Sequence, residues 1–145
     1  PQTLAYSLAD SPTGQMAWIV EKYATWTDCV RDGVRHPENA IGRNALLDIV
    51  THYWMTNTGG SSAKLYWESF TEGDYRPIAL PIGLSIFPKE LFVCTERLAR
   101  TRYQQLVTFN DQHEAGGHFA SLEQPGALIG DIRAWRATLQ EQRLI

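Results

Sequence analysis

The period of the hydrophobic pattern changes after Gly73, and this change limits the folds that the chain can adopt. Before it, apolar residues recur at helical spacing. After it, the pattern predicts a strand that starts just after Pro81, a helix capped by Thr95, a second strand over residues 106–109 and a final helix from Pro125. A strand, a helix, a strand and a helix in this order form a parallel βαβα unit.

The first half of the chain is predicted to be helical. One helix has Pro12 at its first position, where the missing N–H of proline is tolerated. A second helix follows the loop predicted for residues 28–42, and a short third helix spans residues 61–70. The sequence thus divides into a helical segment, residues 1–76, and an α/β segment, residues 77–145, and the chain as a whole is predominantly helical.

Two parallel strands do not make a viable sheet by themselves. Such strands are normally buried on both faces and flanked by further strands. The 145 residues are enough for one ordinary domain with a hydrophobic core. We therefore expect the strands either to belong to a larger sheet or to find neighbours in a second molecule.

The composition excludes some classes of partner. The net charge of −3 gives no broad basic surface for nucleic acid or anionic lipid, and no apolar run reaches membrane-spanning length. Five tryptophans and six tyrosines suit a ring-lined pocket that takes apolar ligands. The two cysteines, Cys29 and Cys94, have no metal-ligand spacing, so we expect free thiols and a reducing, cytoplasmic compartment.

An acid and a histidine follow the two predicted strands. Glu90 comes after the first strand in Phe-Pro-Lys-Glu, and His118 comes after the second in Gly-Gly-His-Phe. In open α/β sheets, catalytic and ligand-binding residues lie on loops at the carboxyl ends of strands, so these two side chains can meet. A carboxylate there holds the tautomer of the imidazole and stabilises its charged form. The order acid, then histidine matches the last two members of an α/β-hydrolase triad.

Each of these residues also has a simpler interpretation. A Gly-Gly-His sequence is often a turn with a surface histidine, and a glutamate before a helix is often a solvated charge or a capping aid. His52 lies within a predicted helix, and His36 and His113 lie in polar loops, so none of the three shares the placement of His118. The acid and the histidine are therefore the stronger pair of candidates.

Several motifs, in order along the chain, resemble one enzyme family. They are Pro-Gln-Thr-Leu-Ala-Tyr at residues 1–6, Asp-Ser-Pro-Thr-Gly at 10–14, Tyr-Trp followed by Thr-Gly-Gly-Ser-Ser within 53–62, Phe-Pro-Lys-Glu at 87–90, and Gly-Gly-His-Phe-Ala-Ser-Leu-Glu-Gln-Pro at 116–125. The ordered set resembles the C-terminal part of the α/β-hydrolase-fold epoxide hydrolases of the microsomal and juvenile-hormone type. The likeness covers nearly the whole chain.

The resemblance implies a fold and a set of roles. Residues 1–76 would be a helical cap, or lid, and residues 77–145 the C-terminal part of the hydrolase core. His118 would be the general base, Glu90 its acid partner and Tyr66 the second epoxide-activating tyrosine. The substrates would be a small apolar epoxide and water, with no metal or organic cofactor. Without the resemblance, Tyr66 is simply an aromatic residue on a short helix.

The nucleophile of such an enzyme is missing from the sequence. A nucleophile elbow needs a strand before the turn, and the only near match, Gly-Gly-Ser-Ser-Ala at residues 59–63, follows a helix. The family implies an aspartate elsewhere, so we expect the chain alone to be inactive without the N-terminal half of the enzyme. Two alternatives stay open: another α/β-hydrolase, such as a haloalkane dehalogenase or an esterase, and a non-catalytic helical or dimerising fragment.

Overall fold

The computed structural model describes residues 1–71 and 76–145, which form two compact units. Among the described residues, the first unit comprises residues 1–25 and 29–71, and the second comprises residues 26–28 and 76–145. The predicted change of pattern at Gly73 lies outside the described residues. In the described part of the chain, no helix combines the length and the apolar character needed to cross a membrane.

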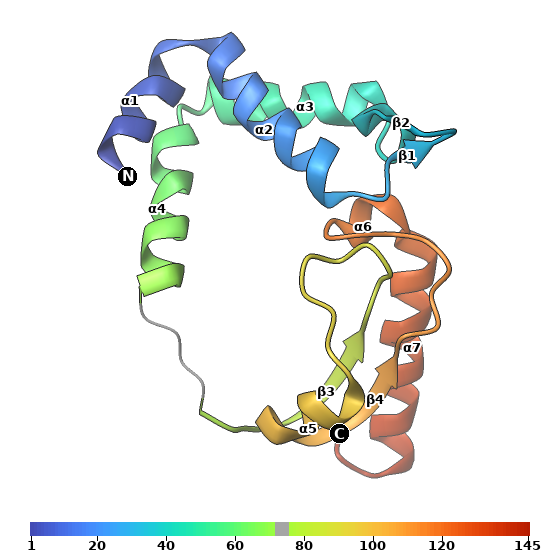
Figure 1. Cartoon of the computed structure of the whole chain (residues 1–145). Helices are drawn as coiled ribbons and strands as arrows, with labels where there is room; N and C mark the ends of the chain where they lie inside the picture. The colour runs from blue at the N-terminus through green and yellow to red at the C-terminus, as the bar shows by residue number, and fades with distance from the viewer. Residues whose placement is uncertain (72–75) are drawn as a thin grey trace. The chain divides into compact units, whose positions relative to one another are not determined.

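The first unit is mainly helical (Figure 1). Helix α1 packs against α4 within this unit. The side chains of Leu8 and Ala63, one from each helix, are buried there. The helices are α1 (Gln2–Asp10), α2 (Pro12–Trp26), α3 (Arg43–Met55) and α4 (Gly59–Thr71), with a short 3₁₀ helix at Pro37–Asn39.

The predicted loop over residues 28–42 is wrong in part, because it contains a small β-hairpin. Strands β1 (Val30–Arg31) and β2 (Val34–Arg35) pair antiparallel across a two-residue turn. The turn residues Asp32 and Gly33 both have positive φ, 51° and 77°. Asp-Gly is a preferred pair for such turns, since both positions need left-handed backbone. The polar composition of the segment concealed this local signal.

The second unit contains the parallel strands that the sequence predicts. Strands β3 (Ile78–Ser85) and β4 (Tyr103–Asn110) pair in parallel and are joined by α5 (Glu96–Arg102). The Thr95 hydroxyl accepts a hydrogen bond from the Leu98 N–H (3.3 Å), as expected of an N-cap. After the short helix α6 (Ala120–Glu123), α7 (Pro125–Glu141) packs along both strands (Figure 1).

The predicted start of the first strand after Pro81 is wrong, since β3 begins at Ile78. The ladder is irregular at this place: Ile78 pairs with Tyr103, but Pro81 pairs with Gln105. Proline lacks an N–H donor and is tolerated on edge strands and at bulges. Within the described residues β3 pairs with β4 alone, so Pro81 lies on an edge strand as well as at an irregular place in the ladder.

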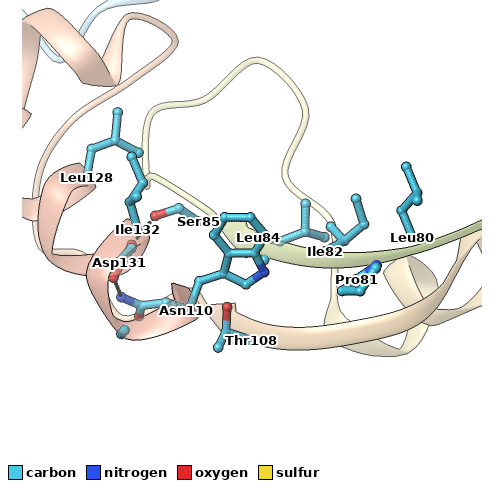
Figure 2. Close-up of a pocket in the computed structure, with 13 residues that line it drawn as sticks. Leu80, Pro81, Ile82, Leu84, Ser85, Thr108, Asn110, Leu128, Asp131 and Ile132 are labelled. Carbon is cyan, nitrogen blue, oxygen red and sulfur yellow. Dashed lines mark hydrogen bonds between the residues drawn. The ribbon is translucent and has the colours of Figure 1, made fainter. Parts of the chain in front are cut away.

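A groove of about 530 Å³ lies along β3 and is bounded by β4 and α7. Figure 2 shows leucine and isoleucine side chains of β3 and α7 lining it, with Ser85, Asn110 and Asp131 at one end. Leu80 is 69% exposed. A strand that is apolar on an open side is unusual for a parallel sheet, whose strands are normally covered on both faces.

Candidate active site

The loops that follow β3 and β4 run side by side beyond the ends of the strands. The Ile86 N–H donates to the Asn110 carbonyl oxygen (2.8 Å), and the Lys89 N–H donates to the Gly116 carbonyl oxygen (3.0 Å). Lys89 also forms an isolated parallel bridge with Gly117. Parallel pairing therefore continues from the sheet into the two loops and brings their next residues together.

The two glycines before His118 are required by the backbone. Gly116 has a φ of +108°, and a Cβ there would lie 2.7 Å from the Phe87 ring. A Cβ on Gly117 would lie 2.7 Å from the Trp26 carbonyl oxygen and 3.1 Å from that of Lys89. A side chain at either position would push the segments apart. The Gly-Gly pair thus lets the histidine loop lie close to its neighbours.

Glu90 and His118, each on its own strand-end loop, are hydrogen-bonded to each other. His118 Nδ1 lies 2.7 Å from Glu90 Oε1, and the same oxygen accepts the Leu91 N–H at 2.6 Å. The side chain of His118 is 38% exposed and that of Glu90 is 26% exposed, so water can reach the pair. The Trp26 ring system and the imidazole make an edge-to-face contact, with ring centroids 5.3 Å apart.

This geometry determines the chemistry that the pair can perform. An ionised carboxylate only accepts hydrogen bonds, so Nδ1 carries the proton and Nε2 is the nitrogen that can accept another. A half-exposed imidazole oriented in this way can act as a general base toward water. A carboxylate in the position of Glu90 can stabilise an imidazolium, as the acid does in hydrolase triads.

Tyr66, the third candidate from the sequence, belongs to the first unit. It lies on α4, is 37% exposed, and makes an edge-to-face contact with Trp18 at a centroid distance of 6.2 Å. The structure therefore brings Glu90 and His118 together and places Tyr66 on a separate unit.

A second polar cluster, which sequence reasoning missed, lies at the ends of the same strands. His113 Nε2 is 2.8 Å from Asp131 Oδ2 and 3.0 Å from the Ser85 hydroxyl, and the Asn110 amide donates to Asp131 Oδ1 at 2.8 Å. The His113 ring stacks flat on Phe87, with centroids 4.1 Å apart, and only 10% of its side chain is exposed.

This cluster has the residue types of a catalytic triad but not the geometry. In a triad, the acid and the nucleophile contact different nitrogens of the imidazole. Here Asp131 and Ser85 both approach Nε2, so no proton relay runs through the ring. The cluster instead ties the ends of β3 and β4 to α7. The position of Ser85 and Asn110 as the last residues of their strands was the available signal.

We expect the stability contributed by this cluster to depend on pH. Burial raises the pKa of Asp131, but hydrogen bonds from Ser85, Asn110 and His113 outweigh burial and hold the pKa below its ordinary value. A lowered pKa stabilises the fold above the unfolded value of about 3.9, and this contribution is lost as the pH falls through the folded pKa.

Asp131→Asn should therefore lower the free energy of unfolding by about 1 kcal/mol at neutral pH, after allowance for solvent screening, and by less near pH 3. Urea unfolding at both pH values measures this, with Asp48→Asn on the exposed face of α3 as the control. An equal loss at both pH values would contradict the assignment.

The chain was compared with known proteins by sequence and by fold. No family model matches it. A protein of Stigmatella aurantiaca that carries a provisional epoxide hydrolase name is 44% identical over 137 residues, covering 92% of this chain and 29% of that protein. Epoxide hydrolase 1 of Sus scrofa is 33% identical over 152 residues, covering 98% of this chain and 33% of that protein.

The fold comparison agrees with the sequence comparison. The crystal structure of juvenile hormone epoxide hydrolase from the silkworm Bombyx mori superposes with a TM-score of 0.79 at 26% identity, covering 99% of this chain and 38% of that one. The chain spans about a third of the length of these proteins. In sequence and in fold the chain is therefore similar, over about a third of their length, to the α/β-hydrolase-fold epoxide hydrolases.

Proposed function

We propose that this chain supplies the acid–histidine pair and one activating tyrosine of an epoxide hydrolase whose nucleophilic aspartate lies outside these 145 residues. The observation that carries the proposal is the 2.7 Å contact between Glu90 and His118 on the loops that follow two parallel strands. The similarity to epoxide hydrolases supports the choice of reaction over other hydrolase chemistries.

The first step of the proposed reaction forms an ester. The aspartate carboxylate attacks one carbon of the epoxide, the ring C–O bond breaks, and the electron pair goes to the ring oxygen. Tyr66 transfers its phenolic proton to that oxygen, which becomes a hydroxyl group. A phenol with a pKa near 10 is protonated at neutral pH and can donate in this way.

The second step hydrolyses the ester and uses the pair seen in the structure. His118 takes a proton from water, and the resulting hydroxide adds to the ester carbonyl carbon. The bond from that carbon to the alkyl oxygen breaks, and the proton of the carboxylic acid so formed passes to the leaving alkoxide, which releases the diol and restores the carboxylate. The proton on His118 returns through solvent to the phenolate. Glu90 stabilises the imidazolium between these events, and the sum is epoxide plus water to diol.

We propose that the helical first unit acts as the cap over this site and contributes Tyr66. The groove along β3 and the exposed Leu80 support the further proposal that the N-terminal half of the enzyme, or a second copy of the chain, covers that side of the sheet. The two free cysteines are consistent with the cytoplasmic location expected from the sequence.

Removal of the Tyr66 hydroxyl separates an epoxide hydrolase from its sister enzymes. In the full-length protein, Tyr66→Phe should lower diol formation from styrene oxide about 10²-fold, because one donor to the developing alkoxide is lost. Tyr103→Phe, on the second unit, is the matched control and should leave the rate unchanged.

The same variants are then assayed on an ester and on a haloalkane. A dehalogenase or an esterase would keep its rate in Tyr66→Phe, since neither reaction needs the phenol. Failure of the full-length wild-type protein to form diol would overturn the proposed function. Native mass spectrometry of the chain, recorded with and without the N-terminal half of the enzyme, shows which partner covers β3. A complex with the N-terminal half and a dimer of the chain differ in mass.

A further inference from the structure

Four backbone amides around His118 are held by residues outside the catalytic pair. The His118 N–H donates to the Trp26 carbonyl oxygen (2.9 Å), and the Gly116 N–H donates to Asp28 Oδ2 (3.1 Å). Glu123 accepts two more: Oε1 from the Phe119 N–H (3.0 Å) and Oε2 from the Asp28 N–H (2.7 Å). All six residues belong to the second unit.

We propose that Glu123 and Asp28 are positioning residues that hold the His118 imidazole in line with Glu90. This inference rests on the proposed function. Their bonds form a closed circuit: Glu123 joins Phe119 to Asp28, and Asp28 joins this segment to Gly116. These hydrogen bonds fix the loop that carries His118 both before and after that residue. A hydrogen bond from a backbone N–H to a carboxylate is stronger than one between two neutral groups, so these contacts hold the loop in place.

The circuit explains why position 123 needs a carboxylate. Each of its two oxygens accepts one backbone N–H, and the two donors come from different segments. A glutamine has nearly the same shape but offers one oxygen and one NH₂ group, so one amide donor would face another donor. The isosteric change Glu123→Gln therefore breaks one bond of the circuit without leaving a cavity.

We expect the loss of this hydrogen bond to slow the second reaction step and not the first. In the proposed mechanism ester formation uses the aspartate and Tyr66, whereas ester hydrolysis needs His118 to be aligned with both water and Glu90. A displacement of about 1 Å can slow a step by about 10²-fold. We therefore expect Glu123→Gln to slow ester hydrolysis about 10- to 100-fold, and to leave the rate of ester formation unchanged.

Two measurements test the inference. Hydrogen exchange by NMR on the full-length protein should show faster exchange at the Gly116, Phe119 and Asp28 amides in Glu123→Gln, with β4 amides unchanged as an internal check of folding. Single-turnover kinetics of the full-length protein with styrene oxide then resolve the two steps. Glu141→Gln, on the exposed end of α7, is the control in both.

The outcomes are distinct. Faster local exchange with slower hydrolysis supports the inference. Unchanged exchange, or faster exchange with a wild-type rate of hydrolysis, overturns it, and so does equal slowing of both steps. If full-length wild type forms no ester at all, the proposed function fails and the positioning role falls with it, while the exchange data still report whether Glu123 holds the loop.

Discussion

Replacing His118 with glutamine in the full-length protein should lower steady-state formation of diol about 10²- to 10⁴-fold, the usual contribution of a general base. Ester formation should keep its wild-type rate, because in the proposed mechanism the imidazole acts only on water in the second step. The enzyme should therefore accumulate as the alkyl ester.

Intact-mass spectrometry of the protein mixed with styrene oxide detects this adduct, and a rapid-quench assay measures the diol. His52→Gln, on the exposed surface of α3, is the control and should not form a lasting adduct. Full turnover in His118→Gln would exclude the histidine as the base, and loss of turnover without an adduct would exclude the two-step route.

The change Gly117→Ala should have the largest effect on stability. The atoms that a new Cβ would meet are backbone atoms of two other segments, the Trp26 carbonyl oxygen at 2.7 Å and the Lys89 carbonyl oxygen at 3.1 Å, and neither can rotate away. One methyl group forced into such a contact costs about 1–3 kcal/mol. Displacing Trp26 also disturbs its contact with His118, so activity should fall with stability.

Gly130→Ala provides the matched control, because it lies inside α7 and a Cβ there meets nothing within 4 Å. Alanine is the better helix former, so this change should raise the free energy of unfolding by up to about 1 kcal/mol. Urea unfolding of both variants measures the two effects. A neutral Gly117→Ala would show that the two loops are less closely packed than the structure indicates.

The parallel βαβα unit could be predicted because its signals are local. The alternation in β3, the Thr95 cap and Pro125 at the start of α7 each report on their own segment, and parallel pairing follows from the order of elements. The same reasoning placed Glu90 and His118 at one edge of the sheet, where the structure has them in contact. Their roles follow from this geometry only as a proposal.

The features that were missed depend on contacts between distant segments. His113 sits in a polar loop by sequence, and its partner Asp131 lies on α7, so only the folded chain reveals the cluster. The same holds for Glu123 and Asp28, which are bonded across 95 positions. The early start of β3 was missed because the rule against proline in strands does not apply at an irregular edge.

Residues 26–28 have a consequence for engineering. They belong to the second unit although residues 29–74 separate them from the rest of it in sequence. A chimera that exchanges residues 1–76 with a homologue would import a foreign backbone against Gly117 and a foreign partner for Glu123. Exchange of residues 1–76 between such proteins should therefore use crossovers that retain this tripeptide, because the contacts of the histidine loop come from two separate stretches of the sequence.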